Sequence, residues 1–276
     1  MTYKTILVHL DLNGDNEGIL KIAGDLAVRL DAKVIGIAAA QPIQPLYDQG
    51  FNTVDLATQH RVEVEKEIAA CETQFRQALE PRIKRMEWRS AVTFDSLAKY
   101  VAAEARCADL IVTGKDIGST LMDTTRRVNI GDLAVKAGKP VLIVPQGISS
   151  LPLQRVFVAW KDTREARRAV ADALPLLEAA GHATVLEITS ETDQEAAKFR
   201  LKDIERWLEA HGIAARSRAI GTPRQDAGYL HAELLNQKCD LLIAGAYGHN
   251  RLGEWMFGGV TEDLLLDPDF CVLLSH

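Results

Sequence analysis

The fold is decided by the stretch Asp240-Leu-Leu-Ile-Ala-Gly-Ala-Tyr-Gly248 and, nine residues later, Gly258-Gly-Val-Thr261. The short apolar run that ends at Gly245 predicts a buried strand, and Val260–Leu266 predicts the opening of a helix. A strand, a glycine-containing loop and a helix start present unblocked backbone N–H groups, which suit an anion. The alternative is that these glycines only shape a turn.

The glycine spacing excludes two common phosphate-binding loops. The dinucleotide fingerprint places its three glycines within six residues, and a P-loop needs Gly-Lys-Ser/Thr. Neither pattern occurs in the Gly-x2-Gly-x9-Gly stretch.

The chain contains an internal duplication, because three segments recur in the same order. The spacing is 131 residues for two of the pairs (114 to 245 and 140 to 271) but 150 for the first strand (4 to 154), so the second copy is shorter between its first and fourth strands. The matching pairs are Cys107–Gly114 with Lys238–Gly245, Pro140–Val144 with Cys271–Ser275, and Lys4–Asp11 with Gln154–Lys161.

Each copy is predicted to alternate short apolar strands with amphipathic helices, which is typical of a parallel sheet covered on both faces. In the helix over 164–180, Thr163 is a candidate N-cap, Gly181 a candidate terminator, and Pro175 predicts a kink or a break. The expected strands are 4–10, 33–39, 88–93, 109–113, 140–144, 155–160, 183–189, 214–220, 241–244 and 271–275. The expected helices are 16–30, 54–80, 95–106, 128–137, 164–180, 194–211, 225–236 and 260–267.

This order and spacing resemble the universal stress protein family over nearly the whole chain, as a tandem member. The resemblance implies an α/β fold of two tandem five-stranded parallel-sheet domains of Rossmann-like type, over residues 1–148 and 152–276. It also implies that the last strands, Pro140–Val144 and Cys271–Ser275, pair with each other. The two domains would then form an internal dimer, and a dimer of tandem chains is a further expectation.

The resemblance further implies a nucleotide site, for ATP with or without Mg²⁺, in the second copy. Phosphate would contact the glycine loop, where Gly259 replaces the family's Ser or Thr, and Lys161 replaces the usual Asp at the end of the first strand. Adenine would contact backbone near Ile188, and His249 is a further phosphate candidate. The predicted binding residues are Gly245, Gly248, His249, Gly258, Gly259, Val260, Thr261, Lys161 and Ile188.

The first copy retains one glycine of the loop and the family's aspartate, Asp11. Gly114 aligns with Gly245, but Ile117, Arg127 and Val128 stand where the second copy has Gly248, Gly258 and Gly259. Stiff β-branched side chains suit a phosphate loop poorly. We therefore expect a degenerate nucleotide loop in the first copy. Arg126 and Arg127 are expected to be a solvated basic pair.

Composition narrows the function classes further. A net charge of −6 and a pI near 5.7 argue against a nucleic-acid binder, which needs a basic face. There is no apolar run of the roughly 20 residues that span a bilayer, and no signal-peptide pattern, so neither a membrane nor a nucleic acid is an expected partner and the cytoplasm is the expected compartment. The four cysteines are widely spaced and are expected to be small buried hydrophobes.

Three functions remain open at this level. The leading one is a cytoplasmic stress-response protein that binds ATP or a related nucleotide as a regulatory ligand. The second is a nucleotide-free binding module, whose partner surface includes the Pro-containing segment Gln41–Gly50. The third is a weak ATPase, although no residue is nominated as catalytic and no metal site is predicted, so an enzyme is the less favoured alternative.

Overall fold

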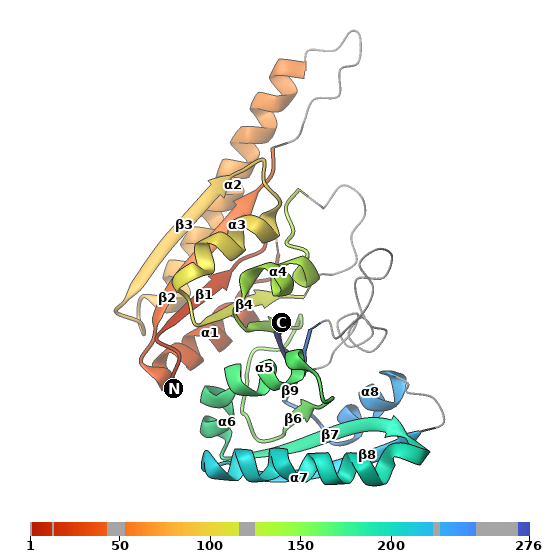
Figure 1. The fold of residues 1–276 in the computed structure, drawn as a ribbon. Coiled ribbons are helices and arrows are strands. Elements are labelled where there is room, and N and C mark those ends of the chain that lie inside the picture. Colours follow the sequence, from red (N-terminus) through yellow and green to blue (C-terminus); the bar gives the residue numbers. More distant parts are fainter. Residues whose placement is uncertain (1, 13, 43–52, 116–124, 223–226, 247–269) are drawn as a thin grey trace.

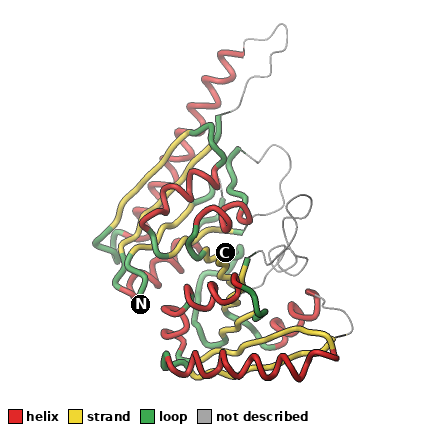
Figure 2. Tube along the Cα trace, in the orientation of Figure 1, coloured by secondary structure: helices red, strands yellow, loops and turns green. Residues whose placement is uncertain are grey.

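A computed structural model describes residues 2–12, 14–42, 53–115, 125–222, 227–246 and 270–276. Within these residues, ten strands form one sheet in the order β3-β2-β1-β4-β5-β10-β9-β6-β7-β8. Helices and strands alternate along the chain, as the two colours of Figure 2 show. The protein therefore has the α/β fold with a largely parallel sheet that the sequence predicts.

The first half of the sheet is built by the first copy. Its strands are β1 (Thr5–His9), β2 (Lys33–Ala40), β3 (Met86–Val92), β4 (Leu110–Gly114) and β5 (Val141–Val144). Its helices are α1 (Glu17–Leu30), α2 (Thr53–Leu79), α3 (Leu97–Glu104) with a 3-10 turn over Ala105–Cys107, and α4 (Ile130–Ala137).

The second half repeats this arrangement. Its strands are β6 (Val156–Ala159), β7 (His182–Ser190), β8 (Ala214–Thr222), β9 (Leu241–Gly245) and β10 (Cys271–Ser275). Its helices are α5 (Arg164–Asp172), α6 (Leu174–Ala180), a 3-10 turn over Glu191–Asp193, α7 (Gln194–Ala210) and α8 (Ala227–Asn236). The helix expected over 260–267 lies outside the described residues.

The two halves meet at the centre of the sheet through β5 and β10 (Figure 1). These strands are antiparallel, with Leu273 opposite Leu142, whereas every other described pairing in the sheet is parallel. The expected pairing of the two last strands is confirmed.

The helices cover both faces of the sheet. One apolar cluster joins the strands to α1 and α2 in the first half and to α5, α6 and α7 in the second. The other joins them to α3, α4 and α8. This division explains why the inner strands β1, β4, β5, β9 and β10 are mostly apolar, since both of their faces are buried.

Local sequence signals set the helix ends in the second half. The Thr163 hydroxyl accepts a hydrogen bond from the backbone N–H of Ala166, 3.3 Å away, and Gly181 ends the segment with a φ of 73°. Pro175 breaks the helix, because α5 ends at Asp172 and α6 begins at Leu174.

The extra length of the first copy lies between β2 and β3. Helix α2 has 27 residues and its counterpart α7 has 17. In Figure 1 the N-terminal part of α2 projects beyond the end of the sheet.

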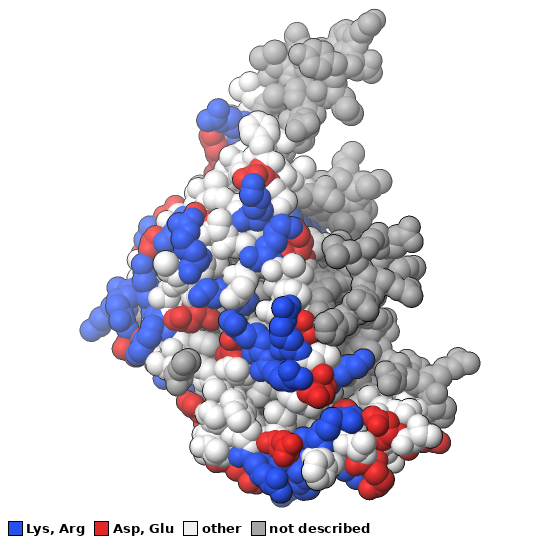
Figure 3. All heavy atoms as spheres, in the orientation of Figure 1, with Lys and Arg blue, Asp and Glu red and all other residues white. Residues whose placement is uncertain are grey.

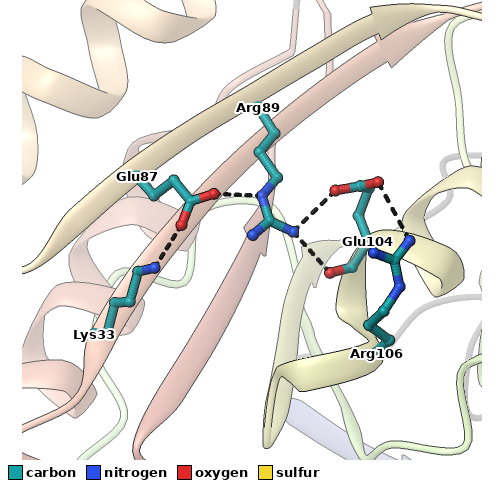
Figure 4. A network of polar contacts seen from close by, with 5 residues as sticks. All are labelled: Lys33, Glu87, Arg89, Glu104 and Arg106. Atoms are coloured by element: carbon teal, nitrogen blue, oxygen red, sulfur yellow. Dashed lines mark hydrogen bonds and ion pairs between the residues drawn. The ribbon is translucent and has the colours of Figure 1, made fainter.

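A charged network covers the edge strand β3 (Figure 4). Arg89 Nε donates to Glu87 Oε1 at 2.7 Å, and Arg89 Nη1 donates to Glu104 Oε2 at 2.9 Å. Glu87 also pairs with Lys33, and the hydrogen bond from Arg89 leads the contacts that lower the pKa of Glu87 to about 2. Charged side chains on an edge strand oppose pairing with other sheets.

The cysteines differ from the expectation at one position. Cys71, Cys239 and Cys271 are buried, but Cys107 is exposed at the end of the 3-10 turn, so the prediction of burial is wrong there. Burial raises the pKa of the Cys71 thiol to about 11 and that of Cys271 to about 12, and it also raises the pKa of Cys239.

We therefore expect one of the four thiols to react rapidly with a disulfide reagent in the native protein. Cys107 is accessible, and the other three thiols are both buried and held in the unreactive protonated form. Release of thiolate from the reagent should show one fast thiol per chain, and Cys107→Ser should abolish it. A second fast thiol in that variant would contradict the burial described here.

Candidate functional site

Three of the predicted binding residues come together at the carboxyl edge of the second half. Strand β6 lies between β7 and β9, and the backbone N–H of Trp160 donates to Leu186 O at 2.7 Å. Lys161 therefore follows β6 at the same edge where β7 carries Ile188 and β9 ends at Gly245. In parallel α/β sheets this edge is where ligands bind.

The environments of these three residues differ. Lys161 is exposed, whereas Ile188 and Gly245 are half-buried. Ile188 contributes to the apolar cluster under α8. The other predicted residues, Gly248, His249, Gly258, Gly259, Val260 and Thr261, lie outside the described residues.

Close packing of α5 accounts for the glycine at 245. A Cβ there would lie 2.6 Å from the backbone N of Ala166 and 2.6 Å from the carbonyl carbon of Glu165. The start of α5 thus approaches β9 too closely for any side chain. This is a structural reason for the first glycine of the loop, and it holds with or without a ligand.

Gly245→Ala should therefore destabilise the protein more than Gly114→Ala at the equivalent position. A Cβ at Gly114 meets the ends of two side chains, Asp11 Oδ2 at 2.9 Å and Ile19 Cδ1 at 3.1 Å, which can move aside. Overpacking against immovable backbone costs about 1–3 kcal/mol. Denaturant unfolding of the two variants tests this, and equal losses would show that the α5 contact is not limiting.

A small cavity lies at the equivalent edge of the first half, among its described residues. Its volume is about 60 Å³, and Asp11, Gly114, Lys115 and Arg127 are among its lining residues. Ligand pockets typically measure about 300–1,000 Å³. The cavity that these described residues line is therefore smaller than a typical ligand pocket.

Arg126 does not have the solvated environment expected for it. Its Nε lies 2.8 Å from Glu67 Oε2 on α2, and the Glu67 side chain is only 9% exposed. The long α2 supplies this partner, which is why reasoning from the local sequence missed the pair. Arg126 therefore anchors the start of α4 to α2.

A buried histidine beneath the first edge was also missed. His9 on β1 is 1% exposed, and its Nδ1 lies 3.0 Å from the Thr113 hydroxyl on β4. The signal was available, because the duplication aligns these two polar residues with Ala159 and Ala244. Burial lowers the pKa of His9, and Asp11, 3.8 Å away, opposes this shift in part.

Acidification should destabilise the native state through His9. Between its ordinary pKa of 6.5 and its lower native value, the unfolded chain binds a proton that the native state does not, so stability falls as the pH falls below 6.5. Unfolding free energies measured from about pH 7.5 to about pH 5 should fall less steeply for His9→Asn than for the unchanged protein. Parallel profiles would remove His9 as a cause.

The described residues contain no cluster of His, Cys, Asp or Glu that could hold a metal ion.

On the face shown in Figure 3, basic and acidic side chains are interspersed. No helix in the described ranges combines the length and apolar character needed to cross a membrane.

Comparison with known proteins gives matches among solved structures. No family model and no curated protein matches the chain. A universal stress protein from Archaeoglobus fulgidus superposes with a TM-score of 0.71 at 18% identity, covering 98% of this chain and 95% of that one. A putative universal stress protein from Pseudomonas aeruginosa gives 0.61 at 16% identity, covering 99% and 93%.

A functionally unknown protein from Pseudomonas aeruginosa is also similar, with a TM-score of 0.58, 17% identity, and coverage of 99% of this chain and 92% of that one. All three matches extend over both halves of the sheet and almost the full length of each partner. At this level of identity they establish architecture. The chain therefore has the fold of a two-domain universal stress protein.

Proposed function

We propose that this chain is a tandem universal stress protein that binds ATP or a related nucleotide in its C-terminal domain, residues 152–276. Residues 1–148 form the partner domain with a degenerate nucleotide loop. The nucleotide acts as a regulatory ligand in a cytoplasmic stress response, and the tandem chain assembles further into a homodimer. ATP binds with or without Mg²⁺.

The observation that carries this proposal is the contrast between the two carboxyl edges. The second copy keeps Gly-x2-Gly-x9-Gly directly after β9, whereas the first copy replaces two of those glycines with Ile117 and Arg127. The duplication thus supplies an internal control for the site.

Lys161 supports a phosphate contact in the second copy. It replaces the acidic Asp11 of the first copy, and it is exposed beside the strand that ends at Gly245. A lysine ammonium binds phosphate as a point charge, so this exchange changes the edge from repelling to attracting an anion. The loss of the family's hydroxyl at Gly259 removes one donor, which weakens the site by about 1.5–3 kcal/mol.

Protein purified without added nucleotide should release about one ATP or ADP per chain, as quantified by mass spectrometry, if one of the two edges binds. Gly258→Val and Lys161→Ala should each lower ATP affinity about tenfold or more in calorimetry, because the first blocks backbone approach and the second removes a cation. Asp11→Asn, at the equivalent edge of the first copy, is the control and should leave affinity unchanged.

Equal affinity in all three variants would contradict the assignment of the site. Absence of any ATP-dependent heat or thermal shift in the unchanged protein would favour the nucleotide-free binding module. ATP turnover that disappears in Gly258→Val would instead favour a weak ATPase, and light scattering with and without ATP tests the homodimer.

A further inference from the structure

A groove in the second half lies between α5 and α7. This groove has a volume of about 420 Å³, within the usual range for a small-molecule site. Its apolar walls are Trp160, Val170, Ile204 and Trp207. Two arginines and two aspartates also line it, Arg167 and Arg200 with Asp162 and Asp203.

The first copy has more apolar or larger side chains at two of the corresponding positions. Counted back from the buried leucines that end the two long helices, Leu79 and Leu208, Ile204 takes the place of Phe75, which is fully buried. Counted from the helix N-caps, Asn16 and Thr163, Arg167 takes the place of the buried Leu20. A smaller side chain and a polar one therefore replace two core residues.

Polar contacts join the start of α1 and the loop before it to α2 in the first copy. Asn16 Nδ2 at the start of α1 donates to Gln74 Oε1 of α2 at 3.2 Å, and the Cys71 thiol lies 3.6 Å from Asp11 O. At the position of Cys71, counted in the same way, α7 carries Arg200, which bonds to Glu187 and Asp193 instead. The open groove is thus a specific difference between two otherwise similar halves.

Two nitrogen donors among the lining residues have no acceptor in the described part of the chain. They are the indole Nε1 of Trp160, whose residue is 7% exposed, and Nε of Arg200. A buried donor without an acceptor has lost its hydrogen bonds to water, at a cost of about 1–3 kcal/mol. An acceptor oxygen on a ligand would restore that interaction.

The remaining chemistry of the groove narrows the ligand class. Two tryptophan rings offer flat apolar surfaces that suit an aromatic ring. Arg167 is paired with Asp162 at 2.7 Å, but both side chains are more than half exposed, so the pair is loosely held at the rim. Arginine there favours a planar anionic group such as a carboxylate or sulfonate.

We propose that the groove between α5 and α7 is a second ligand site, for a small aromatic molecule that carries an anionic acceptor group. The ring lies between Trp160 and Trp207, and the acceptor faces Arg167, Arg200 and the Trp160 indole. The site shares no residue with the proposed nucleotide site, although Trp160 and Asp162 flank Lys161 in the chain. A ligand in the groove would therefore contact the residues on both sides of Lys161, at the end of β6.

The test uses the full-length protein and the fluorescent probe anilinonaphthalene sulfonate. It should bind with a blue-shifted emission and quench the groove tryptophans by energy transfer. Ile204→Phe restores the residue of the first copy and fills the groove, so it should weaken binding at least about tenfold. Phe199→Ala is the matched control, because Phe199 is 76% exposed on the same helix and does not line the groove.

A second groove variant and a neutral probe test the aromatic and the anionic parts of the proposal separately. Trp207→Ala, which introduces the residue found at the equivalent position 78, removes one wall at a site that is 36% exposed, so it should weaken binding without unfolding the chain. The neutral probe phenylnaphthylamine should bind more weakly than the sulfonate, because it lacks the acceptor. Equal binding of both probes would overturn the anionic part of the proposal.

Binding of the sulfonate that is unchanged in Ile204→Phe and Trp207→Ala would overturn the site itself, as would binding that is lost in Phe199→Ala. Gly258→Val should leave probe binding intact. A failure of the nucleotide proposal therefore remains distinguishable from a failure of this one.

Discussion

The antiparallel contact between β5 and β10 is the constraint on which the rest of the structure depends. Val141, Leu142 and Ile143 lie opposite Leu274, Leu273 and Val272, and all six are fully or almost fully buried. Each half alone would expose an apolar strand edge, which is a template for aggregation. Each half therefore covers the edge of the other, and neither half is complete without its partner.

Contacts beside this seam reinforce the same dependence. The Tyr3 hydroxyl donates to Asp172 O at 2.5 Å, and the Ser275 hydroxyl donates to the carboxylate of the same residue at 2.5 Å. The end of α5 is thus fastened both to the beginning of the first copy and to the central strand β10. The bond from Tyr3 crosses the seam and so ties the two halves together, whereas the bond from Ser275 fixes α5 to β10 within the second half.

The same pairing also separates the carboxyl edge of the first half from that of the second. Because β5 and β10 are antiparallel and the strands within each half are parallel, the carboxyl edges of the two halves lie at opposite edges of the sheet. A ligand bound at one edge therefore does not contact the residues of the other edge. This geometry allows the first edge to carry His9, Asp11 and Arg127 while the second keeps its glycines, without a conflict in packing.

The architecture could be predicted from the sequence because the two copies carry the same pattern of strands and helices. Where one copy was ambiguous the other resolved it, and strands such as Cys271–Ser275 begin and end at the residues expected. Two local environments depend on partners that are distant in sequence. Arg126 pairs with Glu67 of α2, and Gly245 is required by the backbone of Glu165 and Ala166, so local spacing alone could not give either reason.

The groove between α5 and α7 lies where the two copies differ in their core residues. Alignment of Ile204 with Phe75 and of Arg167 with Leu20 shows which substitutions accompany the groove. Replacing a buried phenylalanine by a smaller residue costs a few kcal/mol when the surroundings do not collapse. The second half has not collapsed, since the two tryptophans stand at its walls with the space between them open. A fold that leaves such a space beside unpaired donors is stabilised by any ligand that fills it, because binding to the native state alone shifts the unfolding equilibrium.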